Sequence, residues 1–503
     1  MAGFARLPRH ALASASPPNI LFVLADDLDA AELDFMPHVQ SLLVDQGVSF
    51  SNYFVSVSLC CPSRTTMLRG QYSHNTGVRT NGGGNGGFEF AFAMGLEKST
   101  VATWLQASGY RTALYGKYLN GYPNTAPNNY VPPGWTGWGS AVMGDAYSEF
   151  DYTLNENGHP LRYGSRASDY GTDVYSRLAA AFMRRATAAR KPFFVYLSLY
   201  APHVPATPAP RHASLFPDAR APRTPSFDEL DVSDKPTFIR YRPRLRPRAL
   251  LRLDSLYRSR LRSLQAVDEA VAGIVDTLRA IGQLDNTYIV FASDNGFHMG
   301  QHRLVSGKES AYEEDIRVPL IVRGPGVPAG RTVEDLVGNV DLAPTFASLG
   351  GAAVPAFVDG RSLAPLFLGT PRSSWRQAYL VEHWPEEASA DSTREPTDAD
   401  QATGRAALGA GRGGLADGGA RGGVSRARPG AIPEFHALRT ATHTYVEYVT
   451  GERELYDLAA DPFELNNLAA TADSALLQSL ASRLKLMVSC KAASCREAEA
   501  RRH

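Results

Sequence analysis

The stretch NILFVLADD (residues 19–27) decides the fold class of this chain. Its first part is an almost unbroken apolar run, which is typical of a strand that is buried on both faces of a sheet. A helical pattern follows in MPHVQSLLVDQG (residues 36–47), and it ends at a glycine. A buried strand followed by a helix is the repeating unit of an α/β domain with a parallel sheet.

The same alternation recurs along the chain. Helical patterns lead into short apolar runs within residues 99–117, 175–203 and 256–296, and a further apolar run, VPLIVRGPG, covers residues 318–326. Because these runs are apolar throughout and alternate with helices, they predict an α/β fold. We expect a large mixed, mostly parallel sheet sandwiched between helices.

The C-terminal part of the chain has a different pattern. Residues 435–462 alternate between polar and apolar side chains as hairpin strands do, and residues 474–489 have a helical pattern. They predict a small α+β subdomain with an antiparallel sheet. Residues 386–432 are rich in Gly, Ala, Arg and Asp, and a segment of this composition cannot bury a core, so we expect a disordered insertion. The predicted divisions are a flexible segment 1–18, a catalytic α/β domain 19–370, the C-terminal subdomain 371–489 and a tail 490–503.

The composition excludes several classes of protein. Lys and Arg together number 51, as do Asp and Glu, so no excess of positive charge favours nucleic acid or an anionic membrane as partner. No apolar run approaches the roughly 20 residues that span a bilayer. The sequence CKAASC makes a Cys490–Cys495 disulfide plausible, which would imply an oxidising compartment. The N-terminus lacks the apolar centre of a signal peptide. We expect a secreted or periplasmic protein, with a cytoplasmic location as the alternative.

Polar residues follow several of the predicted strands at their carboxyl ends, where open α/β sheets bind ligands. Asp26 and Asp27 end the first strand, Asp294 and Asn295 follow the strand YIVFAS, and Lys117 follows RTALYG. The two acidic pairs offer only oxygen ligands, which suit Ca²⁺ or Mg²⁺ rather than zinc. A single Asp-Asp pair is common in turns and caps, but the second pair makes a metal site the better interpretation.

The cationic residues near these strands have ordinary interpretations when each is taken alone. Lys117 and Lys308 could be solvated loop lysines, and His74, His203 and His298 could be packed loop histidines. Together they would place several cations beside a metal, as an anionic ester substrate requires. This combination, rather than any one residue, indicates a catalytic site.

The stretch SLCCPSRTTMLRG (residues 58–70) identifies the family that the chain resembles. It is similar to the Cys-x-Pro-Ser-Arg signature of the formylglycine-dependent sulfatases, in the alkaline phosphatase superfamily. Residues 294–326 and 454–469 are also sulfatase-like, and the resemblance extends from residue 19 to residue 467 apart from the insertion. The alternative interpretation of Cys60 and Cys61 is a pair of buried free thiols that pack as small apolar groups.

The resemblance implies that Cys60 is oxidised to formylglycine by a formylglycine-generating enzyme, since Pro62 and Arg64 stand at the required spacings from Cys60 and not from Cys61. In such enzymes the aldehyde hydrates, and one hydroxyl binds the metal and attacks the sulfur of a sulfate ester. The second hydroxyl then expels sulfate and restores the aldehyde. The resemblance assigns these further roles: Asp26, Asp27, Asp294 and Asn295, with the hydrate at position 60, as ligands of one Ca²⁺ (or Mg²⁺); Arg64 and Lys117 as holders of the hydrate and sulfate; His203 and Lys308 as proton donors to the leaving alcohol.

One departure from the family pattern concerns the base of the elimination step. Many arylsulfatases have His two residues after the lysine, whereas this chain has Leu119 after Lys117. In this respect it resembles the N-acetylglucosamine-6-sulfatase branch, which implies a sulfated carbohydrate or an aryl sulfate as substrate. His74 and His298 are the candidate bases. The alternatives are a phosphonate monoester or phosphodiester hydrolase of the same superfamily and a non-catalytic protein that binds sulfated glycans.

Overall fold

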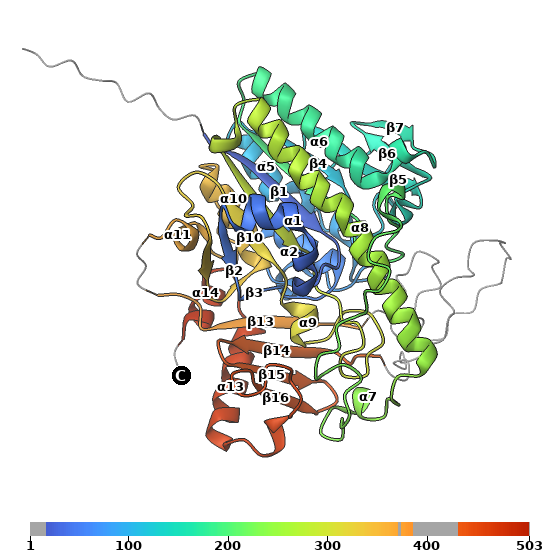
Figure 1. The fold of residues 1–503 in the computed structure, drawn as a ribbon. Helices are drawn as coiled ribbons and strands as arrows, with labels where there is room; N and C mark the ends of the chain where they lie inside the picture. The colour runs from blue at the N-terminus through green and yellow to red at the C-terminus, as the bar shows by residue number, and fades with distance from the viewer. Residues whose placement is uncertain (1–16, 371–373, 386–430, 502–503) are drawn as a thin grey trace, which may run out of the picture.

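The computed structural model describes residues 17–370, 374–385 and 431–501 (Figure 1). The segment for which the sequence predicts disorder, 386–432, lies outside the described residues except for its last two. At that end, Ile432 is buried and belongs to the core of the C-terminal subdomain.

The large sheet is built around strand β1 (Asn19–Ala25), which is buried along its whole length. On one side β1 pairs in parallel with β8 (Phe193–Ser198), which in turn pairs in parallel with β4 (Arg111–Gly116). On the other side β1 pairs in parallel with β9 (Thr287–Ser293). The carboxyl ends of these four strands therefore lie along one edge of the sheet.

The outer strands make the sheet mixed. Its full order is β11-β2-β10-β9-β1-β8-β4-β5-β6-β7, and β10, β2, β6 and β7 are antiparallel to their inner neighbours. This arrangement confirms the predicted large mixed, mostly parallel sheet. The outer strands are β2 (Val48–Phe50), β5 (Gly137–Gly144), β6 (Tyr152–Glu156), β7 (His159–Arg162), β10 (Leu320–Arg323) and β11 (Arg331–Val333).

Helices cover both faces of this sheet (Figure 1). One apolar core contains side chains of α2 (Cys60–Arg69), α5 (Val101–Ala107) and α10 (Leu342–Leu349). A second core, on the opposite face, contains side chains of α6 (Gly171–Ala188) and α8 (Pro247–Ala280). These helices pack because their apolar residues recur at helical spacing, as the buried residues of α6 do. The shorter helices are α1 (Pro37–Val39), α3 (Ser73–Thr76), α4 (Gly87–Ala93), α7 (Thr237–Arg240), α9 (Glu313–Ile316) and α11 (Ala364–Phe367). A separate parallel pair of short strands is formed by β3 (Tyr53–Phe54) and β12 (Val337–Gly338).

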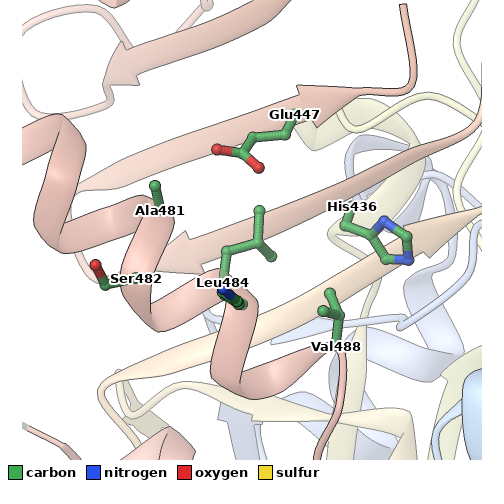
Figure 2. A pocket seen from close by; sticks show the side chains of 7 residues that line it. His436, Glu447, Ala481, Ser482, Leu484 and Val488 are labelled. Carbon is green, nitrogen blue, oxygen red and sulfur yellow. The ribbon is translucent and has the colours of Figure 1, made fainter. Parts of the chain in front are cut away.

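The C-terminal part contains a separate antiparallel sheet, as predicted. Its strands are β13 (Ala378–His383), β14 (Phe435–Thr440), β15 (His443–Tyr448) and β16 (Arg453–Asp457), in that order. Helix α13 (Ser474–Met487) packs against this sheet, and the hollow between α13 and the sheet is lined by His436, Glu447 and Lys485 among others (Figure 2). None of the predicted site residues lies in this hollow.

The segment that the sequence analysis treats as a tail contains helix α14 (Ala493–Ala500). Cys490 and Cys495 form the predicted disulfide at its start, and Cys495 and Ala498 are part of the C-terminal core. Glu499 is also fully buried, where it pairs with Arg376 at 2.9 Å. Helix α14 is therefore held by a covalent bond, by apolar packing and by an ion pair. Across the described ranges, we find no helix long and apolar enough to cross a membrane.

We expect the substitution Arg376→Met to lower the free energy of unfolding by about 3 kcal/mol or more, because it leaves buried carboxylates without a counter-charge. Arg376 is fully buried and pairs with both Asp341 and Glu499. Arg279→Met is the matched control, since Arg279 pairs with Asp276 at the surface and its loss should cost less than about 1 kcal/mol. Chemical denaturation of both variants measures the difference. An equal, small effect in both would contradict the role given to Arg376.

Candidate active site and metal centre

The acidic residues that follow β1 and β9 lie side by side, as the strand order requires. Asp27 follows β1, and its Oδ1 accepts a hydrogen bond of 2.6 Å from the side chain of Asn295, which follows β9. The backbone amide of Asp27 donates to Asp294 Oδ1 at 3.1 Å. Asp26, Asp27, Asp294 and Asn295 are all fully buried. The structure thus brings the predicted oxygen ligands into one cluster.

Helix α2 begins at this cluster and presents Cys60 to it. Cys60 is the first residue of the helix, and its Sγ lies 3.3 Å from Asp26 Oδ1 and 3.9 Å from Asp27 Oδ1. Lys308 Nζ lies 2.9 Å from the same sulfur. A helix N-terminus carries a partial positive charge and free backbone N–H groups, which favour an anion at this place.

Arg64, one turn further along α2, ties the helix to the sheet. Its Nε donates to Asp294 Oδ2 at 2.8 Å, and its guanidinium also donates to Ser198 Oγ and to the carbonyl of Lys117. The side chain is 1% exposed. Because a planar guanidinium can satisfy several acceptors at fixed angles, Arg64 sets the position of α2 relative to the ends of β4, β8 and β9.

Two lysines and a histidine also contact the acidic cluster. Lys117 Nζ donates to Asp26 Oδ2 at 2.6 Å, and Lys308 Nζ donates to Asp27 Oδ1 at 2.7 Å. His203 Nε2 lies 3.6 Å from Asp27 Oδ2, while its Nδ1 lies 2.7 Å from the carbonyl of Val204. Donation from Nδ1 to that carbonyl would leave Nε2 as the nitrogen that faces the cluster.

The donor set of the cluster fits a hard divalent cation. Asn295 Oδ1 and Asp27 Oδ2 are buried oxygens without a hydrogen-bond partner within the described part of the chain. Burial raises the pKa of Asp26 to about 6, and neighbouring Asp294 adds to this shift. Burial alone would also raise the pKa of Asp294, but Arg64, Lys117 and Lys308 outweigh it and hold that pKa below its usual value. Carboxylate and amide oxygens of this kind are the ligands of Ca²⁺ and Mg²⁺.

Cys60 and Cys61 differ sharply although they are adjacent. Cys61 points into the apolar core on the α2 face of the sheet, and burial raises the pKa of its thiol to about 12. Such a thiol is a poor nucleophile, because only the thiolate is reactive. Only Cys60 makes side-chain contacts with the predicted ligands and cations.

The two histidines considered as bases have different positions. His74 contacts none of the cluster: its Nδ1 lies 2.8 Å from Glu382 Oε1 and its Nε2 lies 2.9 Å from the carbonyl of Cys490. Both nitrogens are therefore engaged with the C-terminal subdomain. His298 is buried on the loop that also carries Lys308, and its Nδ1 lies 2.9 Å from Asp315 Oδ1.

Two residues at the site were not anticipated from the sequence. Ser198, the last residue of β8, accepts a hydrogen bond of 2.6 Å from Arg64. The ammonium of Lys117 lies over the ring of Tyr147, 4.9 Å from its centroid, and the ring of His203 lies 4.7 Å from the same ring. A serine at a strand end and a tyrosine in a short 3-10 helix are too common to indicate a site by themselves.

Comparison with known proteins identifies the family of the chain. The family model described as Sulfatase matches residues 18–352. The arylsulfatase of Volvox carteri is 35% identical over 98% of this chain and 77% of its own length. The N-acetylglucosamine-6-sulfatase of Capra hircus is 33% identical over 95% of this chain and 85% of its own length. An extracellular sulfatase SULF-1 homolog of Drosophila melanogaster is 39% identical over 73% of this chain, but the match spans only 33% of that relative.

Two solved structures share the fold. That of BT4656 in complex with its substrate D-glucosamine-2-N,6-O-disulfate has a TM-score of 0.73 at 23% identity, and the match covers 93% of this chain and 97% of that one. The phosphonate monoester hydrolase from Silicibacter pomeroyi has a TM-score of 0.67 at 24% identity, with 94% of each chain covered. At these identities the likeness concerns the fold alone. The family model and the two relatives that align over nearly the whole chain show the family. The chain belongs to the sulfatase family.

Proposed function

We propose that this chain hydrolyses sulfate monoesters to an alcohol and inorganic sulfate, with a formylglycine made from Cys60 as its nucleophile and one bound Ca²⁺. The observation that supports this most strongly is the position of Cys60. Its Sγ lies 3.3 Å from a carboxylate oxygen of Asp26 and 2.9 Å from the ammonium of Lys308. In the mature protein, the hydroxyls of the formylglycine hydrate would stand where this sulfur stands.

The cation would be held by oxygens that are already gathered at the site. Asp26, Asp27, Asp294 and Asn295 would supply these ligands, together with the residue at position 60. When bound, Ca²⁺ would supply positive charge that favours the deprotonated form of a hydrate hydroxyl and attracts the sulfate oxygens. Mg²⁺ is the alternative ion, because it prefers the same type of ligand.

The residues of the chain would act in two steps. In the first, a hydroxyl of the hydrate attacks sulfur, the bond from sulfur to the alcohol oxygen breaks, and His203 or Lys308 gives that oxygen a proton. In the second, a base removes the proton of the remaining hydroxyl, the C=O bond re-forms and sulfate leaves. Water then hydrates the aldehyde again. Arg64 and Lys117 would hold the hydrate and sulfate through these steps.

The base of the second step would be His298 rather than His74. Both nitrogens of His74 are engaged with Glu382 and with the carbonyl of Cys490, so it has no free nitrogen for proton transfer. Asp315 lies against Nδ1 of His298 and would orient that ring and stabilise its protonated form.

We expect His203→Gln to slow the hydrolysis of alkyl sulfates about 10²-fold, because their poor leaving groups need a proton as they depart. Aryl sulfates with acidic phenols should slow by less than about 10-fold, since a phenolate leaves without help. His74→Gln is the control and should leave both rates close to those of the wild type. Steady-state kinetics with both substrate types test this, and equal losses for alkyl and aryl sulfates in His203→Gln would contradict the role of His203 as an acid.

The substrate would be a sulfated carbohydrate or an aryl sulfate. Relatives of both types align over nearly the whole chain, the N-acetylglucosamine-6-sulfatase and the arylsulfatase. The shared fold with a phosphonate monoester hydrolase makes phosphonate monoesters or phosphodiesters the second candidate. A panel of sulfate esters assayed beside phosphonates and phosphodiesters separates the two. We expect the highest kcat/KM for a sulfate ester, and a higher value for a phosphonate or phosphodiester would overturn the assignment.

The protein would be exported after modification by a formylglycine-generating enzyme. The Cys490–Cys495 disulfide supports an oxidising compartment, and two of the relatives are described as extracellular sulfatases. The chain spans 33% and 52% of the lengths of these two relatives. Mass spectrometry of the culture medium and cell fractions of the native host would locate the protein.

A further inference from the structure

A second group of ligand-type side chains, two of them buried and one half-buried, lies outside the active site. It consists of His302, Glu314 on α9, and Glu464 in the segment after β16, and one ligand atom of each lies within 4.8 Å of the other two. His302 is 0% exposed and Glu464 is 1% exposed. The group therefore joins the loop that carries Lys308 and helix α9 to the C-terminal subdomain.

Each of these side chains is held through one atom, and a second atom is left for a ligand. His302 Nδ1 lies 2.7 Å from Glu229 Oε2, Glu314 Oε1 accepts from Ser226 Oγ at 3.3 Å, and Glu464 Oε2 accepts from the backbone N–H of residue 313 at 3.0 Å. The opposite atoms are His302 Nε2, Glu314 Oε2 and Glu464 Oε1. All three are buried and have no hydrogen-bond partner among the described residues.

From this arrangement we propose that His302, Glu314 and Glu464 bind a divalent transition-metal ion, Zn²⁺, at a structural site separate from the active site. One imidazole nitrogen and two carboxylate oxygens form a ligand set that Zn²⁺ accepts, with water in the remaining position. The carboxylate of Glu229 behind the imidazole is the outer partner that metal-bound histidines usually have. A tetrahedral ion with bonds of about 2.1 Å keeps its ligands about 3.4 Å apart, so rotation of the two carboxylates would close the site.

The charges around the group also favour a cation. Within the described residues, neither Glu314 nor Glu464 forms an ion pair, whereas Glu229 pairs with Lys235 at 3.5 Å. Burial raises the pKa of Glu314 to about 7 and that of Glu464 well above its usual value, and burial lowers the pKa of His302. Burial is the largest cause of each shift, and the nearby Arg439 lowers the pKa of Glu464 only in part. A dication among the three side chains would offset the cost of burying the two carboxylates.

The local backbone is consistent with a constrained site. His302 and Glu464 have φ angles of 51° and 53°, in the left-handed region that residues other than glycine seldom adopt. The ring of His302 stacks on that of Tyr312 with centroids 3.9 Å apart, which fixes the direction of Nε2. The surrounding structure thus holds both ligands in conformations that cost free energy.

The test is a Zn²⁺ titration of the full chain, stripped with a chelator and then supplied with excess Ca²⁺ to fill the active site. We expect one Zn²⁺ per wild-type chain by equilibrium dialysis and elemental analysis. Glu314→Gln and Glu464→Gln should each weaken this binding at least about 10-fold, because an amide is a weaker ligand than a carboxylate. Co²⁺ in place of Zn²⁺ should give the visible absorption of a four-coordinate ion.

Two controls make the result specific to this site. Glu313→Gln changes the neighbouring residue, whose carboxylate pairs with Arg439, and should bind Zn²⁺ as the wild type does. Asp294→Asn alters the active site and should also retain Zn²⁺. A site without metal, in which the three side chains share protons, predicts a different result. Glutamine resembles a protonated glutamate in shape, so in that case the glutamine variants and the wild type would not differ in Zn²⁺ binding. Failure of the wild type to bind Zn²⁺, or equal binding by Glu314→Gln, Glu464→Gln and the wild type, would overturn the proposal.

Discussion

Replacement of Cys60 by alanine is expected to reduce sulfate ester hydrolysis at least about 10⁴-fold, because it removes the precursor of the nucleophile. Cys60→Ser should be equally inactive in turnover for a different reason. A serine hydroxyl could attack sulfur once, but it has no second hydroxyl with which to expel sulfate. Intact-protein mass spectrometry after incubation with substrate should then show a chain that carries one sulfate group.

Cys61→Ser is the matched control for this prediction. Cys61 is the next residue of α2, and its thiol lies in the apolar core rather than against the carboxylates. We expect its kcat to stay within about 10-fold of the wild type, with a lower stability because a hydroxyl replaces a buried sulfur. Loss of activity in Cys61→Ser together with retained activity in Cys60→Ala would exchange the roles of the two cysteines and contradict the proposed mechanism.

Asp27→Asn is expected to lower kcat/KM about 10³-fold and to weaken Ca²⁺ binding, since it removes a negative charge from the centre of the cluster. Asp27 contacts Lys308, Asn295 and His203, so its charge also positions the cations of the site. Calorimetric titration with Ca²⁺ and steady-state kinetics with an aryl sulfate measure the two effects. Removal of Ca²⁺ from the wild type with a chelator should lower its activity to a similar extent.

Asp29→Asn is the matched control, because it removes the same negative charge from a nearby position that is not a proposed Ca²⁺ ligand. Asp29 lies two residues further along the chain, where its side chain accepts a hydrogen bond from the backbone of Ala31 and caps a short helix. Asparagine is an equally good cap, so Asp29→Asn should leave both Ca²⁺ affinity and activity close to those of the wild type. Undiminished Ca²⁺ binding by Asp27→Asn would exclude Asp27 as a ligand.

Much of the fold could be predicted because the central strands have a strong signal. Strands β1, β8 and β9 are buried along their whole length and apolar except at their ends, which is typical of the inner strands of a parallel sheet. The outer strands β5 to β7 were not predicted, because β7 is exposed throughout and β5 contains several glycines. Helix α14 was treated as a tail, since its short polar sequence packs only through a few positions. Such elements are specified by tertiary contacts more than by their own sequence.

The candidate site could be predicted as far as strand ends and sequence motifs determine it. Asp26, Asp27, Asp294 and Asn295 follow neighbouring strands, so their proximity follows from the topology. The contacts of His74 are of another kind. The sequence gives no means of knowing that the C-terminal subdomain would engage both of its nitrogens, because that contact joins residues more than 300 positions apart. The approach of Tyr147 to His203 is likewise a tertiary contact between residues far apart in the sequence.

The most direct test of the proposed chemistry is the mass of a proteolytic peptide that spans residue 60, taken from protein made in its native host. The proposal predicts the mass deficit of thiol-to-aldehyde conversion at Cys60 and an unmodified thiol at Cys61. An unmodified Cys60, in a host that is shown to convert another signal of this type, would contradict the mechanism. The chain would then be better explained as a non-catalytic protein that binds sulfated glycans.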